Sequence, residues 1–146
     1  MKNIFILSLI LLFKLSSYSQ STISCSLIEV IANPKKFDNK QVSITGIFQF
    51  KNGDLGILFF SKDDEKYSIF KNGLLIYLGD RLKDREKLLR INGHTIEIIG
   101  DFSSEKKGFG DYFSGSISNI TDIVSLEDAL IEQKYIEIKT SSAKPE

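Results

Sequence analysis

Apolar and polar residues alternate along two stretches of this chain in the same pattern. The stretches are "NKQVSITGIF" at 39–48 and "NGHTIEIIGDF" at 92–102, and they align without a gap. The equivalent positions are Lys40 and His94, Val42 and Ile96, Ile44 and Ile98, Gly46 and Gly100, and Phe48 and Phe102. Alternation with a period of two predicts two strands, each with one buried face. The glycine inside each strand predicts a bend or a bulge.

The other strands are predicted from alternation between turn signals. The Asn-Gly pair in "KNGD" at 51–54 predicts a hairpin. The stretch 55–61 that follows is apolar on both faces, so either a helix covers its outer face or that face meets a partner. Beyond it we expect a charged loop at 62–66, a short strand at 67–70, a strand around 75–78 and a long final strand at 111–123, bent at Gly115.

Apolar residues at helical spacing predict three helices. The first begins after Ser26, which can cap it, and ends before Pro34. The second covers "RLKDREKLLR" at 81–90 and has mixed charges on its outer side. Its inward residues are Leu82, Leu88 and Leu89. The third is capped by Ser125, and we expect the polar end of the chain after it to be disordered.

Five strands with a helix between the third and fourth, and a long first strand bent at a glycine, describe an OB-fold. We therefore expect a mainly β, five-stranded OB-like Greek-key barrel with a short N-terminal helix, a helix between the third and fourth strand regions and a C-terminal helix. The stretches "VIANPKKFDNKQVSITGIF", "LGILFFSKDD", "INGHTIEIIGDF" and "YFSGSISNITDI" resemble small exported bacterial proteins with an OB-like barrel. The resemblance implies no activity, because that family has none assigned.

The first residues are typical of a signal peptide. A basic start precedes the apolar run "IFILSLILLF", and the small residues Ser17 and Ser19 follow it. The run is shorter than the roughly 20 residues that span a bilayer. We therefore expect an exported protein, periplasmic or extracellular, with no membrane span in the mature chain; the alternatives are an uncleaved anchor or a buried helix. The predicted divisions are a signal peptide at 1–19, a short linker at 20–25, the barrel domain with flanking helices at 26–135 and a tail at 136–146.

No catalytic or metal-binding constellation is evident in the sequence. His94 is the only histidine, and its place at a strand entrance predicts an exposed residue there. Cys25 is the only cysteine, so it forms no internal disulfide; its sequence context argues against lipidation and predicts a passive thiol. Glu97 and Asp101 are the acids whose strand positions would suit a nuclease. We expect a protein that is not an enzyme and has no catalytic residue, metal site or cofactor.

The charge balance argues against nucleic acid as the main ligand. The chain has 19 basic and 19 acidic residues, and removal of the predicted signal peptide removes two lysines. Phosphate binding uses clustered Lys and Arg. The balance does not exclude a local basic patch.

Aromatic residues in two loops are the candidate binding residues. Phe109 and Tyr112 lie in "GFGDYF" at 108–113, in the predicted hairpin between the fourth and fifth strands. That hairpin borders the ligand cleft of OB-folds, where aromatic rings stack on ligands. Phe60 and Tyr67 form a second candidate patch. The alternative is that the glycines make the turn while Phe113 enters the core.

These observations predict a binding module that recognises a protein or glycan through the barrel face and its aromatic loops. One alternative is a secreted hydrolase of phosphodiesters or cell-wall sugar. Another is an accessory subunit of an envelope assembly. The ligand and the oligomeric state are left open by the sequence.

Overall fold

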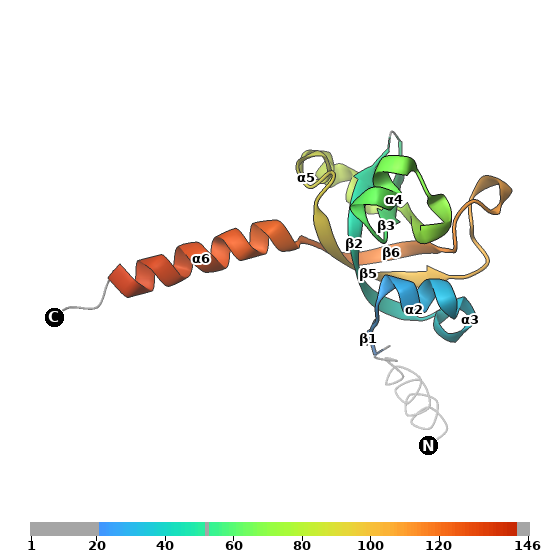
Figure 1. Cartoon of the computed structure of the whole chain (residues 1–146), viewed down its shortest axis with the longest axis horizontal. Helices are drawn as coiled ribbons and strands as arrows, with labels where there is room; N and C mark the ends of the chain where they lie inside the picture. The colour runs from blue at the N-terminus through green and yellow to red at the C-terminus, as the bar shows by residue number, and fades with distance from the viewer. Residues whose placement is uncertain (1–20, 52, 143–146) are drawn as a thin grey trace, which may run out of the picture.

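A closed barrel of five strands forms the centre of the part of the chain that the structure describes (Figure 1). This computed structural model describes residues 21–51 and 53–142, so the predicted signal peptide at 1–19 lies outside the described residues. The barrel strands are β2 (Gln41–Phe50), β3 (Leu55–Phe59), β4 (Gly73–Tyr77), β5 (Thr95–Ser103) and β6 (Ser116–Ser125). Their order is β2-β3-β4-β6-β5, and β5 pairs with β2 to close the barrel. The OB-like Greek-key prediction is confirmed.

The two strands with the repeated pattern pair with each other. β2 and β5 run antiparallel, and Ile44 lies opposite its own equivalent, Ile98. A local two-fold axis therefore relates the two stretches, and each glycine lies opposite an aliphatic residue of the other copy: Gly46 opposite Ile96 and Gly100 opposite Val42. The repeat describes two neighbouring strands of one barrel.

Both glycines allow a third strand to approach closely. A Cβ atom added to Gly46 would lie 2.7 Å from Leu58 Cγ and 2.8 Å from the Phe59 carbonyl oxygen of β3. A Cβ atom added to Gly100 would lie 2.7 Å from Ile117 Cγ2 and 2.8 Å from the Ser118 carbonyl oxygen of β6. The register of β5 and β6 is irregular between Ile99 and Asp101, so the predicted bulge is confirmed at the second glycine.

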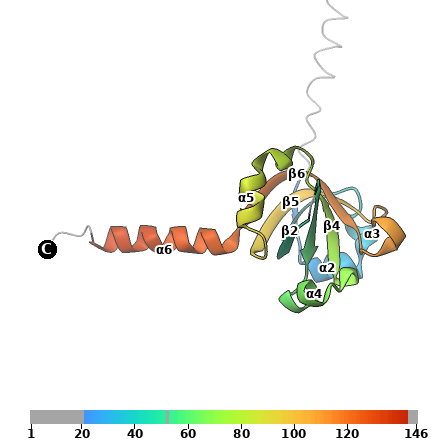
Figure 2. The same ribbon diagram turned by 90° about the horizontal axis from the view of Figure 1, so that it is seen from above.

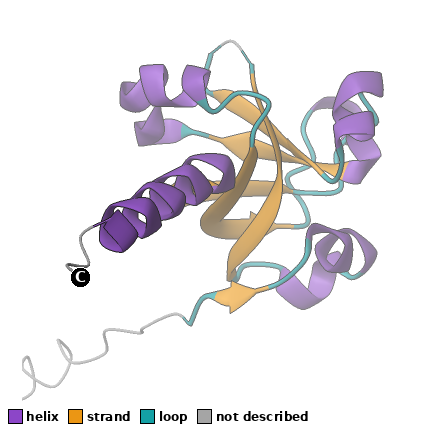
Figure 3. Cartoon of the chain, turned by 60° about the vertical axis from the view of Figure 1, so that its left-hand side comes forward, coloured by secondary structure: helices purple, strands orange, loops and turns teal. Residues whose placement is uncertain are grey.

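Short helices lie outside the strands and cover the barrel (Figure 3). Near the N-terminus, α2 (Leu27–Ala32) has a Ser26–Glu29 capping box and α3 (Pro34–Phe37) follows directly. Between β4 and β5, the 3₁₀ helix η2 (Gly79–Asp84) continues into α5 (Arg85–Arg90). The helical residues buried in the main core are Leu27, Val30, Phe37 and Leu88. Leu89 was predicted to point inward, but it is exposed. The short helix α5 packs only one face against the barrel, and Leu88 lies on that face.

Several local predictions are corrected by the structure. The expected linker at 20–25 contains β1 (Ile23–Ser24), which pairs in parallel with β2 and thereby satisfies its backbone groups. The expected charged loop is α4 (Lys62–Tyr67), because Ser61 accepts a hydrogen bond from the Asp64 N–H and caps a helix. The stretch 67–70 forms no strand; Phe70–Asn72 is the 3₁₀ helix η1.

The C-terminal helix extends away from the barrel (Figures 1 and 2). α6 spans Leu126–Ser142 and is capped by Ser125, whose hydroxyl accepts a hydrogen bond from the Asp128 N–H at 3.2 Å. The predicted tail at 136–146 is therefore helical as far as Ser142. The prediction of disorder is wrong for residues 139–142, because these polar residues extend a helix that is already nucleated, and residues 143–146 lie outside the described residues.

A carboxylate joins the α3 turn to the end of β5. Asp38 Oδ1 accepts a hydrogen bond from the Ser104 backbone N–H at 2.6 Å. Ser104 is buried, so its N–H needs this partner. Hydrogen bonding from Ser104 holds the pKa of Asp38 below its ordinary value.

We expect Gly46→Ala and Gly100→Ala each to lower the free energy of unfolding by about 1–3 kcal/mol, because the new Cβ atom meets a backbone carbonyl oxygen. Chemical denaturation measures the loss. Thr45→Ala, an exposed change on the same strand, is the control and should cost less than about 1 kcal/mol. Unchanged stability in both glycine variants would contradict the close approach of the strands.

We expect Asp38→Asn to lower stability at neutral pH and to lose this effect in acid. The folded-state pKa of Asp38 lies below the unfolded value, so the carboxylate contributes stability above the unfolded value, near pH 4. That contribution disappears as the pH falls through the folded-state pKa. Denaturation midpoints measured from neutral pH downward should therefore converge for the two proteins; Asp54→Asn, in the exposed hairpin turn, is the control.

Candidate functional site

The aromatic residues predicted to bind ligand are exposed but do not gather. Phe60 follows β3, Tyr67 ends α4 and Tyr112 lies in the loop at 104–115; their relative exposures are 49%, 65% and 60%. None of the three rings stacks on another ring among the described side chains. The side chain of Phe109 lies outside the description. Ligand contact by these four residues stays a prediction.

Three other rings, each close in sequence to a predicted one, do converge. The ring centroids of Phe59 and Phe70 are 6.1 Å apart, and those of Phe70 and Phe113 are 5.3 Å apart. Together they form a cluster with Ile47 and Ile57 on the outer face of β2 and β3. We call this cluster, Ile47, Ile57, Phe59, Phe70 and Phe113, the outer cluster. The sequence left open whether a helix or a partner covers the outer face of β3. Rings from the chain's own loops cover it.

Hydrogen bonds hold the two covering loops together. The Ser114 hydroxyl donates to the Lys71 carbonyl oxygen at 2.6 Å, and the Ser114 N–H donates to the Gly73 carbonyl oxygen at 3.2 Å. The Lys71 ammonium group donates to the Asp111 carbonyl oxygen. Phe113 packs against the outer cluster and is partly buried there, so it does not enter the main core as the alternative prediction had it. The face that OB barrels commonly use for ligands is occupied here by the chain itself.

His94 is a structural anchor for the C-terminal helix. Its Nδ1 lies 3.0 Å from Glu127 Oε2 and 3.1 Å from Ser125 Oγ, and Glu127 Oε1 accepts the Thr95 N–H at 3.1 Å. The prediction of a strand-entrance position is correct, but the residue is only partly exposed. Its partners come from α6 and the end of β6, which no local sequence pattern could identify.

The remaining titratable candidates also have structural partners. Glu97 accepts the Ser43 hydroxyl, and Asp101 Oδ2 accepts Asn119 Nδ2 at 2.9 Å. Burial raises the pKa of the Cys25 thiol, and the Glu29 carboxylate raises it further. A raised pKa disfavours the reactive thiolate form. Within residues 21–51 and 53–142, no three His, Cys, Asp or Glu side chains are placed to hold a metal ion.

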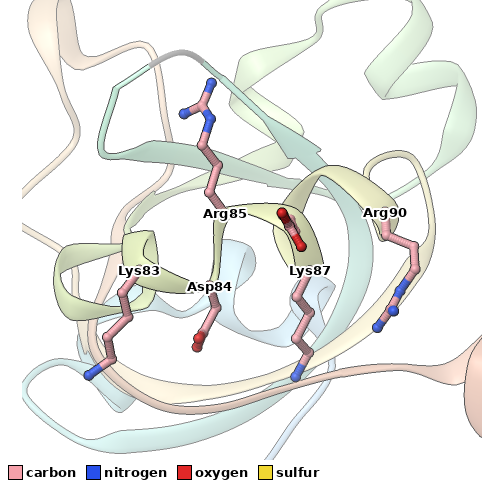
Figure 4. A pocket seen from close by; sticks show the side chains of 6 residues that line it. Lys83, Asp84, Arg85, Lys87 and Arg90 are labelled. Carbon is pink, nitrogen blue, oxygen red and sulfur yellow. The ribbon is translucent and has the colours of Figure 1, made fainter.

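A basic segment borders a large open cavity. The segment 81–90 contains five cations and two acids, in a chain whose formal net charge is zero. The cavity has a volume of about 950 Å³ (Figure 4). Its lining residues are Lys83, Asp84, Arg85, Glu86, Lys87 and Arg90. We call the exposed side of η2 and α5 that these residues form the basic surface.

Two cations bind the basic segment to the barrel. The Arg81 Nε donates to the Ile120 carbonyl oxygen at 3.2 Å, and Lys87 Nζ donates to the Ile123 carbonyl oxygen at 2.9 Å. These contacts are to neutral carbonyl groups of β6, so neither positive charge is neutralised by them. The basic segment is therefore fixed in place without loss of its charge.

The other cations extend in different directions from the backbone. Figure 4 shows Lys83 and Lys87 on either side of Asp84, with all three side chains extending to one side, while Arg85 extends to the opposite side. The Arg85 guanidinium lies over the Phe50 ring, 5.2 Å from its centroid. Arg90 Nε lies 4.0 Å from Asp128 Oδ2, at the limit of an ion pair.

From its mixed charges, segment 81–90 was expected to present the solvated face of a helix and no binding site. The available signal was the local charge count at 81–90, which the overall balance of the chain conceals.

None of the helices in the described residues is long and apolar enough to cross a membrane.

Comparisons with known proteins identify no family. No family model and no curated protein matches the sequence. Among solved structures, the chain is similar to the S. pombe Stn1-Ten1 complex, with 10% identity and a TM-score of 0.45 over 86% of this chain and 97% of that one. It is also similar to the telomere capping protein Ten1 from the same yeast, with 11% identity and a TM-score of 0.43 over 82% of this chain and 99% of that one. Likeness at this level concerns the fold and assigns no ligand to this chain.

The titles of these structures do not agree with several predictions. The structures found are titled as a telomere capping protein and its complex, and neither title names an exported protein or a glycan binder. Neither title agrees with the predicted signal peptide or with the secreted or periplasmic location. Neither title agrees with the protein-or-glycan binding function, with its hydrolase and envelope alternatives, or with the prediction that nucleic acid is not the main ligand. The prediction on nucleic acid used the charge of the whole chain, whereas anion binding depends on local clusters of charge, which that balance left open.

We expect Phe113→Ala to lower the free energy of unfolding by about 1–3 kcal/mol, because it removes a ring that packs against Phe70 and the rest of the outer cluster. It should also increase the binding of a dye that detects exposed apolar surface. Tyr112→Ala removes the neighbouring exposed ring and is the control, with an expected change within about 0.5 kcal/mol. Equal effects of the two variants would contradict the role assigned to Phe113.

Proposed function

We propose that this chain is a non-enzymatic OB-fold domain that binds single-stranded nucleic acid through the phosphate backbone at the basic surface. The observation that carries the proposal is that Lys83, Arg85, Lys87 and Arg90 line one open cavity of about 950 Å³. Clustered Lys and Arg side chains attract phosphate groups by charge and release the counterions that surround a nucleic acid. Two acids line the same cavity, so the expected affinity is moderate.

The pairing of Arg85 with Phe50 favours a single strand over a duplex. A guanidinium stacked on a ring leaves a planar, cationic face exposed to ligand. Unpaired bases stack on such faces, and OB-fold proteins that bind single strands combine them with a charged groove. Phosphate contacts from the lysines and stacking at Arg85 would together hold the strand without reading its sequence.

The titratable residues of the barrel support a binding role. His94, Glu97 and Asp101 each engage partners from a neighbouring element, and these contacts join β5 to β2, β6 and α6. Residues that serve as anchors are poorly placed to exchange protons with a substrate. Membership of a family of small bacterial OB-like proteins stays a prediction. So does ligand contact by Phe60, Tyr67, Phe109 and Tyr112.

The test is fluorescence anisotropy of a labelled oligothymidylate strand titrated with the full chain at several salt concentrations. If all four cations each neutralise a phosphate, the logarithm of the association constant should fall against the logarithm of salt with a slope of about −3. Lys83→Glu combined with Lys87→Glu should weaken binding at low salt by at least about tenfold. A duplex of the same sequence should bind more weakly.

The matched control is Lys106→Glu combined with Lys107→Glu, which changes the net charge by the same amount in the loop at 104–115. This control should retain the affinity of the natural chain. An equal loss in both double variants would show that only net charge matters and would contradict the basic surface as the site. Absence of binding at low salt would contradict the function itself.

A further inference from the structure

The last three turns of α6 have no cover from the barrel. The contacts of α6 with the strands come from its first turn, where Glu127 accepts hydrogen bonds from Thr95 and lies beside His94. Beyond it, the helix extends into solvent in both views of Figures 1 and 2. Its large apolar side chains are more than half exposed: Leu130, Ile131, Tyr135 and Ile136.

A helix in this position is marginal by itself. α6 has 17 residues, and most helical stability in proteins comes from packing of an apolar face. Anchoring of the first turn removes the nucleation cost but does not bury the large apolar side chains of the later turns. A second surface that covers the exposed residues would therefore stabilise both the helix and the contact.

One face of α6 has the spacing of a helix pair. Ile131 and Tyr135 are four residues apart, and the sequence continues three residues later with isoleucine at 138. Alternating steps of four and three residues form the seam along which two helices pack. Glu132 and Lys139 lie along one edge of this seam, and Lys134 lies along the other.

These edge charges distinguish the possible partners by direction. In a parallel pair, edge residues five positions apart face each other, so Lys134 would face Lys139 of the second copy and Glu127 would face Glu132. Both contacts are repulsive. In an antiparallel pair, each edge faces the same edge of the other helix. In the register that places position 131 of one helix beside position 142 of the other, Glu132 of each copy faces Lys139 of the other. This contact occurs twice.

We propose that α6 is the surface through which two copies of this chain associate, with the last three turns of the helices packed antiparallel. The charge complementarity of Glu132 and Lys139 selects a second copy as the occupant. This register uses the turns that the barrel leaves free and keeps Glu127 with His94. The contact is related by a two-fold axis, so it closes at two copies. Its length of about 12 residues gives an interface in the small, weak class, and the dimer depends on concentration.

The test is sedimentation equilibrium of the full chain over about a hundredfold range of concentration. The apparent mass should rise from one copy toward two. Ile131→Glu places a charge in the seam and should raise the dimer dissociation constant at least about tenfold. Ile136→Glu makes a similar change off the seam and is the matched control, with a change below about threefold. Circular dichroism checks that both variants remain folded.

Charge reversal tests the direction. Glu132→Lys and Lys139→Glu should each weaken an antiparallel dimer, and the double variant should restore it. In a parallel pair each single reversal would strengthen association, because Glu132→Lys would meet Glu127 and Lys139→Glu would meet Lys134. A chain that stays monomeric throughout, equal effects of Ile131→Glu and Ile136→Glu, or strengthening by the single reversals would overturn the proposal. None of these outcomes depends on nucleic acid binding.

Discussion

The close approach of three strands at Gly46 and Gly100 is the constraint on which the rest of this structure depends. At each glycine, the barrel wall turns from the β2–β5 pair toward a further strand, β3 at one end and β6 at the other. The backbone carbonyl groups of Phe59 and Ser118 occupy the space that a side chain would need. Because both turns use the same device about a local two-fold axis, one short sequence pattern occurs twice.

Closure of the barrel places loops with different composition at its two ends. The segments at 60–72 and 104–115 meet at one end, where the Phe70 and Phe113 rings cover the outer face of β3. The turn at 51–54 lies beside the start of η2 at the other end, since the Leu78 N–H donates to the Asp54 carbonyl oxygen at 2.9 Å. Rings from the two loops cover the outer face of β3 at one end, and the cationic segment lies at the other end.

The barrel was predictable because its strands carry a strong local pattern. Alternation identified the buried residues of β2 and β5, and the Ser26 and Ser125 caps marked the starts of two helices. Around Phe59 and Phe60, both neighbours are aromatic, so periodicity could not decide which ring is covered. Phe59 is the covered ring because Phe70 and Phe113, from later parts of the chain, pack against the cluster that contains it. The signal for α4 was present in Ser61 and Asp64 but was outweighed by the run of charges.

The strand faces and the helix caps, and hence the barrel class, follow from the local sequence, because they depend on residues near one another in the chain. The identity of the buried rings and the anchoring of α6 by His94 emerged from the tertiary structure alone. These depend on pairs such as Phe70 with Phe113 and His94 with Glu127, which are more than thirty residues apart. Local composition carries no information about such pairs until the barrel closes and brings the elements together.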